Sequence, residues 1–286
     1  MNRSYTHRVV VCLVIAAAAC APSARRPPTE LPPLPRLPDT PTPSAGPWTF
    51  THAPGTRAYR ISRNASIEGT ADSVSRREIV SNFTHETITL EPGEERTTFR
   101  AVVDSFAVLS EGLVGPPQQV VVPVELIGSI GSDGLRIEET SSDRCNAVTA
   151  IAVTDLHNLL TQFPSPLAKN TTWKDSITTS GCYAGIQTTV AARRRFTVTG
   201  EIDFSGRRLL LIQRLDSISA LGDGAYNQHR MNVESTGTGS ARYYLDTGSG
   251  EVAQMTTSHL SRITVTTSGR VRSFTQTTNQ DLVRVR

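Results

Sequence analysis

Cysteines have the most specific chemistry in this sequence, and the chain contains four of them: Cys12, Cys20, Cys145 and Cys182. They lack both the Cys-x-x-Cys spacing and the nearby paired histidines of a zinc site. In an oxidising compartment, two separated thiols commonly form a structural disulfide. We therefore favour a Cys145–Cys182 bridge over a metal site, with a stabilisation of roughly 4 kcal/mol in the chain-entropy description.

The first 19 residues indicate export. A short basic segment precedes an apolar run at 9–19, which includes Cys12 and ends in small residues. This run is too short to cross a bilayer, which takes a helix of about 20 residues. The pattern is typical of a cleaved signal peptide, so we assign residues 1–19 to the signal and make Cys20 the first residue of the mature chain.

Cys20 is the predicted lipid-attachment residue. The segment Ala17-Ala18-Ala19-Cys20 resembles the lipobox of bacterial lipoproteins, although Ala17 stands where leucine is usual. The resemblance implies a membrane anchor through lipid on the cysteine sulfur, whereas ordinary secretory cleavage is the alternative. The residue after Cys20 is Ala21, in place of the aspartate that commonly retains lipoproteins at the inner membrane. We therefore expect outer-membrane attachment in a Gram-negative cell.

Residues 20–47 predict a tether. Ten of the 17 prolines in the chain lie between Pro22 and Pro47. Closely spaced proline fixes φ, removes amide donors and favours an extended polyproline II path. We expect this segment to hold the domain at 48–286 away from the membrane.

The residues that could catalyse a reaction are scattered. Asp246-Thr247-Gly248-Ser249 matches the tetrapeptide of aspartic proteases, but those enzymes use two aspartates and the sequence has no second copy. The same residues fit a hairpin turn before Val252. The sequence has no Gly-x-Ser-x-Gly motif, and its histidines show no metal spacing. These histidines are His7, His52, His85, His157, His229 and His259. We expect no catalytic residue and no cofactor; a hydrolase with a scattered site is an alternative.

Charge excludes one class of partner. The formal net charge is only +3, which gives no electrostatic basis for binding nucleic acid. The basic clusters are Arg193-Arg194-Arg195 and Arg207-Arg208. We interpret the first cluster as a solvated sheet edge, because charged side chains on an edge discourage pairing with another chain.

Short alternating runs separated by turn residues predict antiparallel strands in most of the domain. Asp133-Gly134 suits a tight hairpin, and Pro123 predicts an edge or bulge. The expected strands are Ala58–Glu68, Ser75–Leu90, Thr97–Ser110, Val120–Gly128, Leu135–Thr140, Ile186–Asp203, Leu209–Ala220, Arg230–Thr238, Ala241–Asp246, Val252–Thr267 and Val271–Thr278.

One segment has helical periodicity. Apolar residues recur at three- and four-residue steps from Val148 to Phe163, before Pro164 ends the pattern. We expect a helix over about 147–163 that packs on the sheet, with His157 at its solvated boundary. The fold class is therefore mainly β (a β-rich α+β fold), with a curved antiparallel sheet or two half-barrel lobes and one central helix.

The two halves of the domain show weak similarity, which suggests a duplication of 58–142 and 172–286. Val103-Asp104-Ser105-Phe106-Ala107 matches Leu215-Asp216-Ser217-Ile218-Ser219, and each is followed by a glycine-marked hairpin. If the two segments are equivalent, we expect two related half-barrels with the helix between them.

The order of these features resembles a known class of exported proteins. Phe163-Pro164 comes nine residues before Trp173-Lys174-Asp175, and Tyr244-Leu245-Asp246 precedes a glycine turn. With the signal, Cys20 and the spacer, the pattern is similar to bacterial lipoproteins of the broad LolA, LolB and LppX type. The resemblance implies a curved sheet that holds acyl chains against helices.

Together these features lead us to expect a non-enzymatic, membrane-tethered envelope lipoprotein that binds an apolar or amphipathic ligand, such as a lipid, or an envelope protein. A structural or assembly module without a ligand cavity is the alternative.

The intact mass of the mature N-terminal peptide tests the anchor. We expect Cys20 to carry acyl chains that add hundreds of daltons to the peptide. A Cys20→Ala variant should lose this mass and leave the membrane fraction. An unmodified Cys20 in the native chain would instead show ordinary secretory cleavage.

Overall fold

The computed structural model describes residues 46–71, 74–111, 118–119, 124–138, 145–183, 185–204, 206–226 and 229–285. Cys20, the predicted signal, nearly all of the predicted tether and Pro123 lie outside these residues. In the described part of the chain, no helix is long and apolar enough to cross a membrane.

Twelve strands and one helix make up the described domain. The first half contains β1 (Gly55–Ala71), β2 (Val74–Glu91), β3 (Thr97–Glu111), β4 (Gln118–Gln119), β5 (Val124–Gly131) and β6 (Gly134–Glu138). Helix α1 (Ala147–Leu159) follows. The second half contains β7 (Thr172–Tyr183), β8 (Ile186–Phe204), β9 (Arg207–Tyr226), β10 (His229–Asp246), β11 (Glu251–Thr267) and β12 (Arg270–Arg284).

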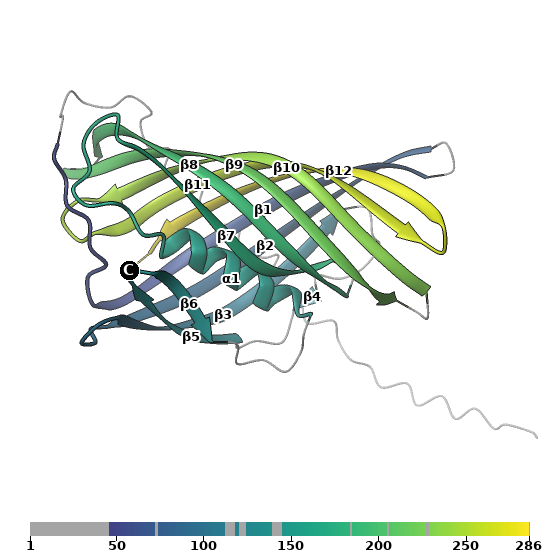
Figure 1. Cartoon of the computed structure of the whole chain (residues 1–286), viewed down its shortest axis with the longest axis horizontal. Coiled ribbons are helices and arrows are strands. Elements are labelled where there is room, and N and C mark those ends of the chain that lie inside the picture. The colour runs from purple at the N-terminus through teal and green to yellow at the C-terminus, as the bar shows by residue number, and fades with distance from the viewer. Residues whose placement is uncertain are drawn as a thin grey trace, which may run out of the picture. The chain divides into compact units, whose positions relative to one another are not determined.

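All strands join one curled, half-barrel sheet (Figure 1). Its order is β6-β5-β3-β2-β1-β12-β11-β10-β9-β8-β7, with the short β4 paired to β3. Each half is a run of sequential antiparallel hairpins. Antiparallel pairing of β1 with β12 joins the halves over eleven register pairs, from Tyr59–Arg284 to Gly69–Phe274. The result is one curved sheet rather than two separate lobes.

Helix α1 lies between the two edges of this sheet. It packs against β7, which is one edge strand, and against β5, which is next to the other edge strand (Figure 1). Asn146 caps its first turn by accepting hydrogen bonds from the amides of Val148 (2.9 Å) and Thr149 (3.2 Å), which satisfies donors that a helix start leaves free. The helix covers an apolar surface that the open sheet would otherwise expose to water.

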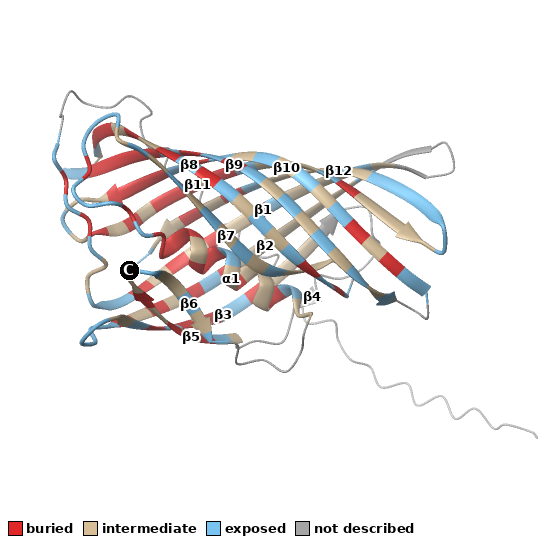
Figure 2. Ribbon diagram, in the orientation of Figure 1, coloured by how far each residue is buried: buried red, intermediate tan, exposed pale blue. Residues whose placement is uncertain are grey.

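The main core fills the concave face where α1 lies (Figure 2). Successive residues of a strand point to opposite faces, and buried inward residues of nine strands belong to this core together with residues of the helix. Fully buried members include Ile61, Ile88, Leu156, Phe196, Ile212, Tyr243, Leu245 and Leu282. This half of the concave face is occupied by the protein's own side chains.

Phe163 occupies the centre of the aromatic part of this core. Its ring makes edge contacts with Phe50 at 4.8 Å, Tyr243 at 5.8 Å and Trp173 at 5.9 Å between centroids. Trp173 in turn stacks on Phe196 at 4.8 Å. Such pairs add to the stabilisation from buried area, and they fix the chain just after α1 against β7, β8 and β10.

The sequence prediction of a mainly β fold with one helix is confirmed, with three local differences. Helix α1 ends at Leu159, earlier than expected, and Leu160 caps it. Strand β10 continues through Gly239, because register pairs on both sides support it. Strand β7 has few apolar residues and was absent from the predicted strands.

The two halves place the matching aspartates differently. Asp104 is exposed and accepts a hydrogen bond from Thr87 at 2.6 Å, at a register shift between β2 and β3. Asp216 is buried on β9. The duplication therefore stays a hypothesis, and the two aspartates are not structurally equivalent.

The expected disulfide is present. Cys145, just before α1, is bonded to Cys182 near the end of β7, with their Cα atoms 5.2 Å apart. The bridge attaches the start of the helix to β7, which is an edge strand of the sheet.

Removal of the bridge should lower the free energy of unfolding by about 2–4 kcal/mol, because the unfolded chain regains conformational freedom. Denaturant unfolding of a Cys145→Ser/Cys182→Ser variant measures the loss. Reductant should lower the stability of the native protein to the same level and leave the variant unchanged. Two reactive thiols at these positions without reductant would contradict the bridge.

Candidate functional site

A row of register-paired residues, all polar except Ala241, crosses the concave face beside the core. Starting at Arg214 on β9, the register passes through Ala241, Thr257 and Gln280 to Arg63 on β1 and then Asn82 on β2. Side chains on one face of paired strands lie next to each other. The register therefore places two inward arginines at separate points of one continuous row.

Helix α1 supplies partners for these arginines. Asp155 forms an ion pair with Arg63 and accepts a 2.9 Å hydrogen bond from Gln280. Asn158, nearly one turn later, accepts a 2.8 Å bond from Arg214. Residues three apart on a helix lie on neighbouring parts of its surface, so one polar stripe of α1 reaches both β1 and β9.

A third arginine binds the end of the helix from β8. Arg194 forms a bidentate pair with Asp175 on β7, at 2.7 and 2.5 Å, and donates a 3.3 Å bond to the His157 carbonyl. Thr161 donates to the same carbonyl at 2.7 Å. Burial, aided by the positive charge of Arg194, lowers the pKa of His157 to about 4, so this imidazole is neutral at pH 7.

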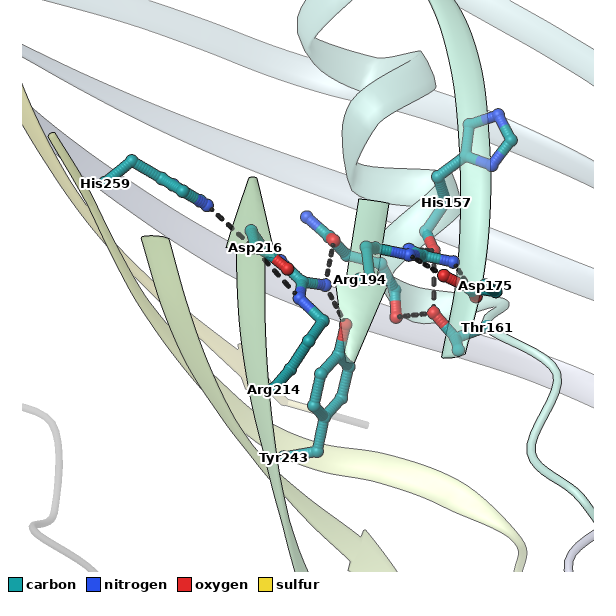
Figure 3. Close-up of polar contacts among 9 residues, drawn as sticks. His157, Thr161, Asp175, Arg194, Arg214, Asp216, Tyr243 and His259 are labelled. Atoms are coloured by element: carbon teal, nitrogen blue, oxygen red, sulfur yellow. Dashed lines mark hydrogen bonds and ion pairs between the residues drawn. The ribbon is translucent and has the colours of Figure 1, made fainter. Parts of the chain in front are cut away.

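Asp216 lies between Arg214 and His259, as Figure 3 shows. It accepts bonds from Arg214 at 2.8 and 3.1 Å and pairs with the His259 Nε2 at 3.1 Å. Burial alone would raise the pKa of Asp216, but the bonds from His259 and Arg214 and the arginine charge outweigh it and lower the pKa. The carboxylate is therefore ionised, and Tyr243 accepts a further bond from Arg214.

Gly239 permits the contact between His259 and Asp216. The two residues sit on β11 and β9, and each is paired in register with Gly239 on the intervening β10. A Cβ at this glycine would lie 1.9 Å from the His259 Cδ2. The imidazole can cross β10 only because position 239 has no side chain.

Glu86 is the unpaired acid of this region. It is buried on β2, and both of its carboxylate oxygens lack a hydrogen-bond partner among the described residues. Burial raises the pKa of Glu86 well above its ordinary value, and the charge of nearby Asp155 raises it further. The side chain is therefore held in its neutral, protonated form.

This polar network can bind and orient groups, but its geometry gives no catalytic set. His259 is hydrogen-bonded to Asp216, and Asp216 also accepts a bond from Arg214. In the described part of the chain, no hydroxyl nucleophile is bonded to the imidazole. No group of three metal-ligating side chains occurs among the described residues. We conclude that the network chiefly holds the helix and the sheet together.

A pocket lies at the opposite end of the strands from the core. It has a volume of about 660 Å³ and is lined by Tyr183, His229, Met231, Val265, Thr267, Ser268, Arg270, Arg272 and Phe274. The strand members of this set have the same inward parity as the core residues of β10, β11 and β12. The pocket is therefore a continuation of the concave face beyond the part that α1 fills.

The polar motifs singled out in the sequence lie apart from one another in the structure. Asp246 forms the expected hairpin, because its carboxylate accepts bonds from the amides of Gly248 (2.9 Å) and Ser249 (3.3 Å). The interpretation of Arg193–Arg195 as a sheet edge is wrong, since β8 lies between β7 and β9. Arg193 and Arg195 face water, whereas Arg194 points inward.

Sequence reasoning missed most of the network. Arg214 and Asp216 are spaced by two residues, as neighbours on one face of a strand must be, and that spacing was the available signal. Arg63 and His259 had no such signal, because their partners come from distant segments. No sequence pattern grouped the pocket residues together.

Comparisons with known proteins give limited similarity. No protein-family model and no curated protein matches the chain. Among solved structures, Pseudomonas aeruginosa OpdQ is matched over 81% of this chain and 99% of its own, with 8% identity and a TM-score of 0.25. OccK2 (OpdF) of the same organism, in complex with glucuronate, is matched over 81% and 98%, with 6% identity and a TM-score of 0.27. Similarity of this degree assigns neither a family nor a function.

A Gly239→Ala substitution should break the contact of His259 with Asp216. We expect a loss of about 1–3 kcal/mol in unfolding free energy, the usual cost of losing a hydrogen bond to a buried charge. In a His259→Ala background the same substitution should cost little, because the clashing ring is gone. An equal cost in both backgrounds would contradict the proposed role of Gly239.

Glu86 should make stability depend on pH. Because its folded pKa is raised, its stabilising contribution is fully present below pH 4.5, its unfolded value, and is lost as pH rises toward the folded pKa. A Glu86→Gln variant should therefore gain stability relative to the native protein as pH rises above that value. Denaturant unfolding across this range measures the gain. The exposed Glu91→Gln is the control, and parallel curves for Glu86→Gln and native protein would contradict the account.

Proposed function

We propose that this chain is an exported lipoprotein, tethered through Cys20, whose domain binds an apolar or amphipathic ligand without catalysing a reaction. The observation that carries the proposal is the pocket of about 660 Å³ at the open end of the concave face. Clefts of this size, with apolar walls and a few polar groups, are typical of small-molecule sites.

The division of the concave face supports ligand binding at this end. Around α1 the face is filled by buried side chains of the core. At the far end, a smaller cluster of Ile186, Met231, Val233 and Ile263 forms an apolar floor. Tyr183 and Val265 pack against that floor and also line the pocket. An apolar ligand there would extend an existing hydrophobic surface.

The convex face has the side chains of a surface that is exposed to water. Its outward positions on β8 include Arg193 and Arg195, and Arg262 is exposed on β11. The large apolar residues exposed on this face, Leu215, Leu221, Leu260 and Val271, are separate positions on three strands. Single exposed apolar residues are normal on soluble surfaces. A lipid on Cys20 would then supply the attachment to the membrane.

Binding of the neutral fluorescent dye phenylnaphthylamine tests this function. We expect saturable binding to the purified protein and at least about tenfold weaker binding after Met231→Asp, because a charge in the apolar floor opposes an apolar ligand. Leu221→Asp places the same charge on the convex face and should leave binding unchanged. Phe274→Ser, at a partly exposed position, is the second pocket variant. Absence of saturable binding by the native protein would refute the function.

A further inference from the structure

We propose that the pocket at the open end selects an anionic amphiphile, whose carboxylate or similar head binds Arg270 and Arg272 while its apolar body lies against Phe274, Val265 and Met231. This inference rests on the proposed function and adds the chemical class of the ligand. Two features of the pocket carry it: the position of its charges and the length of its apolar floor.

The two arginines stand side by side at the rim. They are two residues apart on β12, so both point to the concave face, and both line the pocket. Arg270 is paired with Thr267 and Arg272 with Val265 on β11. Both side chains are exposed, and no ion pair joins either guanidinium to an acid in the described part of the chain. Paired guanidinium groups suit a carboxylate or phosphate because each offers several fixed donors.

Among the described residues, no acid lines the pocket. Its other ionisable lining groups are His229, whose Nδ1 lies 3.2 Å from the Ser268 hydroxyl, and Tyr183. Burial raises the pKa of Tyr183, so its phenol stays neutral. The charge of the described lining residues is therefore positive, and it would attract an anion and repel a cation of the same shape.

The apolar floor and the pocket-lining Phe274 come directly after the arginines along the concave face. Phe274 is the next inward residue of β12 and is paired with Gly69 on β1, where a Cβ would lie 2.5 Å from the phenyl ring. The ring thus lies against Gly69 of β1. Val265 and Met231 complete the apolar wall from β11 and β10. The ligand head would stay at the rim, and its apolar body would point inward.

The floor is short. The next inward residue of β12 after Phe274 is Gln276, whose amide bonds to Thr278 at 3.0 Å. The four residue steps from Arg272 to Gln276 span about 13 Å, the length of an extended chain of roughly ten carbons. The geometry therefore favours a medium-length chain or a ring system over a long acyl chain.

Displacement of bound phenylnaphthylamine by matched ligands tests the selection. Decanoate should displace the dye at about tenfold or more lower concentration than decanol, because the arginines add charge-assisted hydrogen bonds. In an Arg270→Gln/Arg272→Gln variant the two ligands should become equivalent, while the dye itself still binds. Arg193→Gln/Arg195→Gln removes the same charge at the same spacing from the convex face and should keep the preference.

The outcomes separate the two proposals. If the dye does not bind the native protein, the proposed function fails. If the dye binds but decanoate and decanol displace it equally, or if the preference survives in the Arg270→Gln/Arg272→Gln variant, anion selection alone fails. Co-sedimentation with vesicles distinguishes a soluble ligand from a membrane headgroup. Arginine-dependent binding to phosphatidylglycerol but not phosphatidylcholine vesicles, without any decanoate preference, would overturn the soluble amphiphile in favour of a lipid surface.

Discussion

The contact on which this fold depends is the one between three inward arginines and a single helix. Arg63, Arg194 and Arg214, from β1, β8 and β9, reach Asp155, the His157 carbonyl and Asn158. Burying a guanidinium costs several kcal/mol unless charges and hydrogen bonds compensate it. The helix therefore has two roles: it covers the apolar half of the concave face, and it supplies acceptors to cations that the curved sheet turns inward.

Small residues make such contacts possible across intervening strands. His259 reaches Asp216 over Gly239, and Phe274 lies over Gly69. At Gly224 on β9, a Cβ would lie 2.8 Å from the Ile186 side chain, which packs in one cluster with Met231 on β10. In each case the missing side chain lets neighbours on a concave face lie closer together, as a tightly curled sheet requires. The glycines thus shape both the polar network and the pocket.

Patterns within a few residues carried most of what the sequence could reveal. Period-two alternation identified most strands, three- and four-residue steps identified α1, and Asp246 with its glycines identified a hairpin. Contacts between distant segments left no local trace. Pairing of β1 with β12 and the ion pair of Arg63 with Asp155 join residues more than 90 positions apart. The edge strand β7 was missed because its alternation is between polar residues, and the inward role of Arg194 followed only from its neighbours in the sheet.

In the proposed function, α1 divides the concave face into a filled half and an open, ligand-binding half. The Arg214–Asp216–His259 group lies between them, with its imidazole 22% exposed. A crystal structure of the protein with ω-bromodecanoate tests this division most directly, through the anomalous signal of the bromine. The account predicts bromine density on the apolar floor, beside Phe274, Val265 and Met231, with the carboxylate at Arg270 and Arg272. Bromine density inside the core around α1, or none in the pocket at saturating ligand, would contradict it.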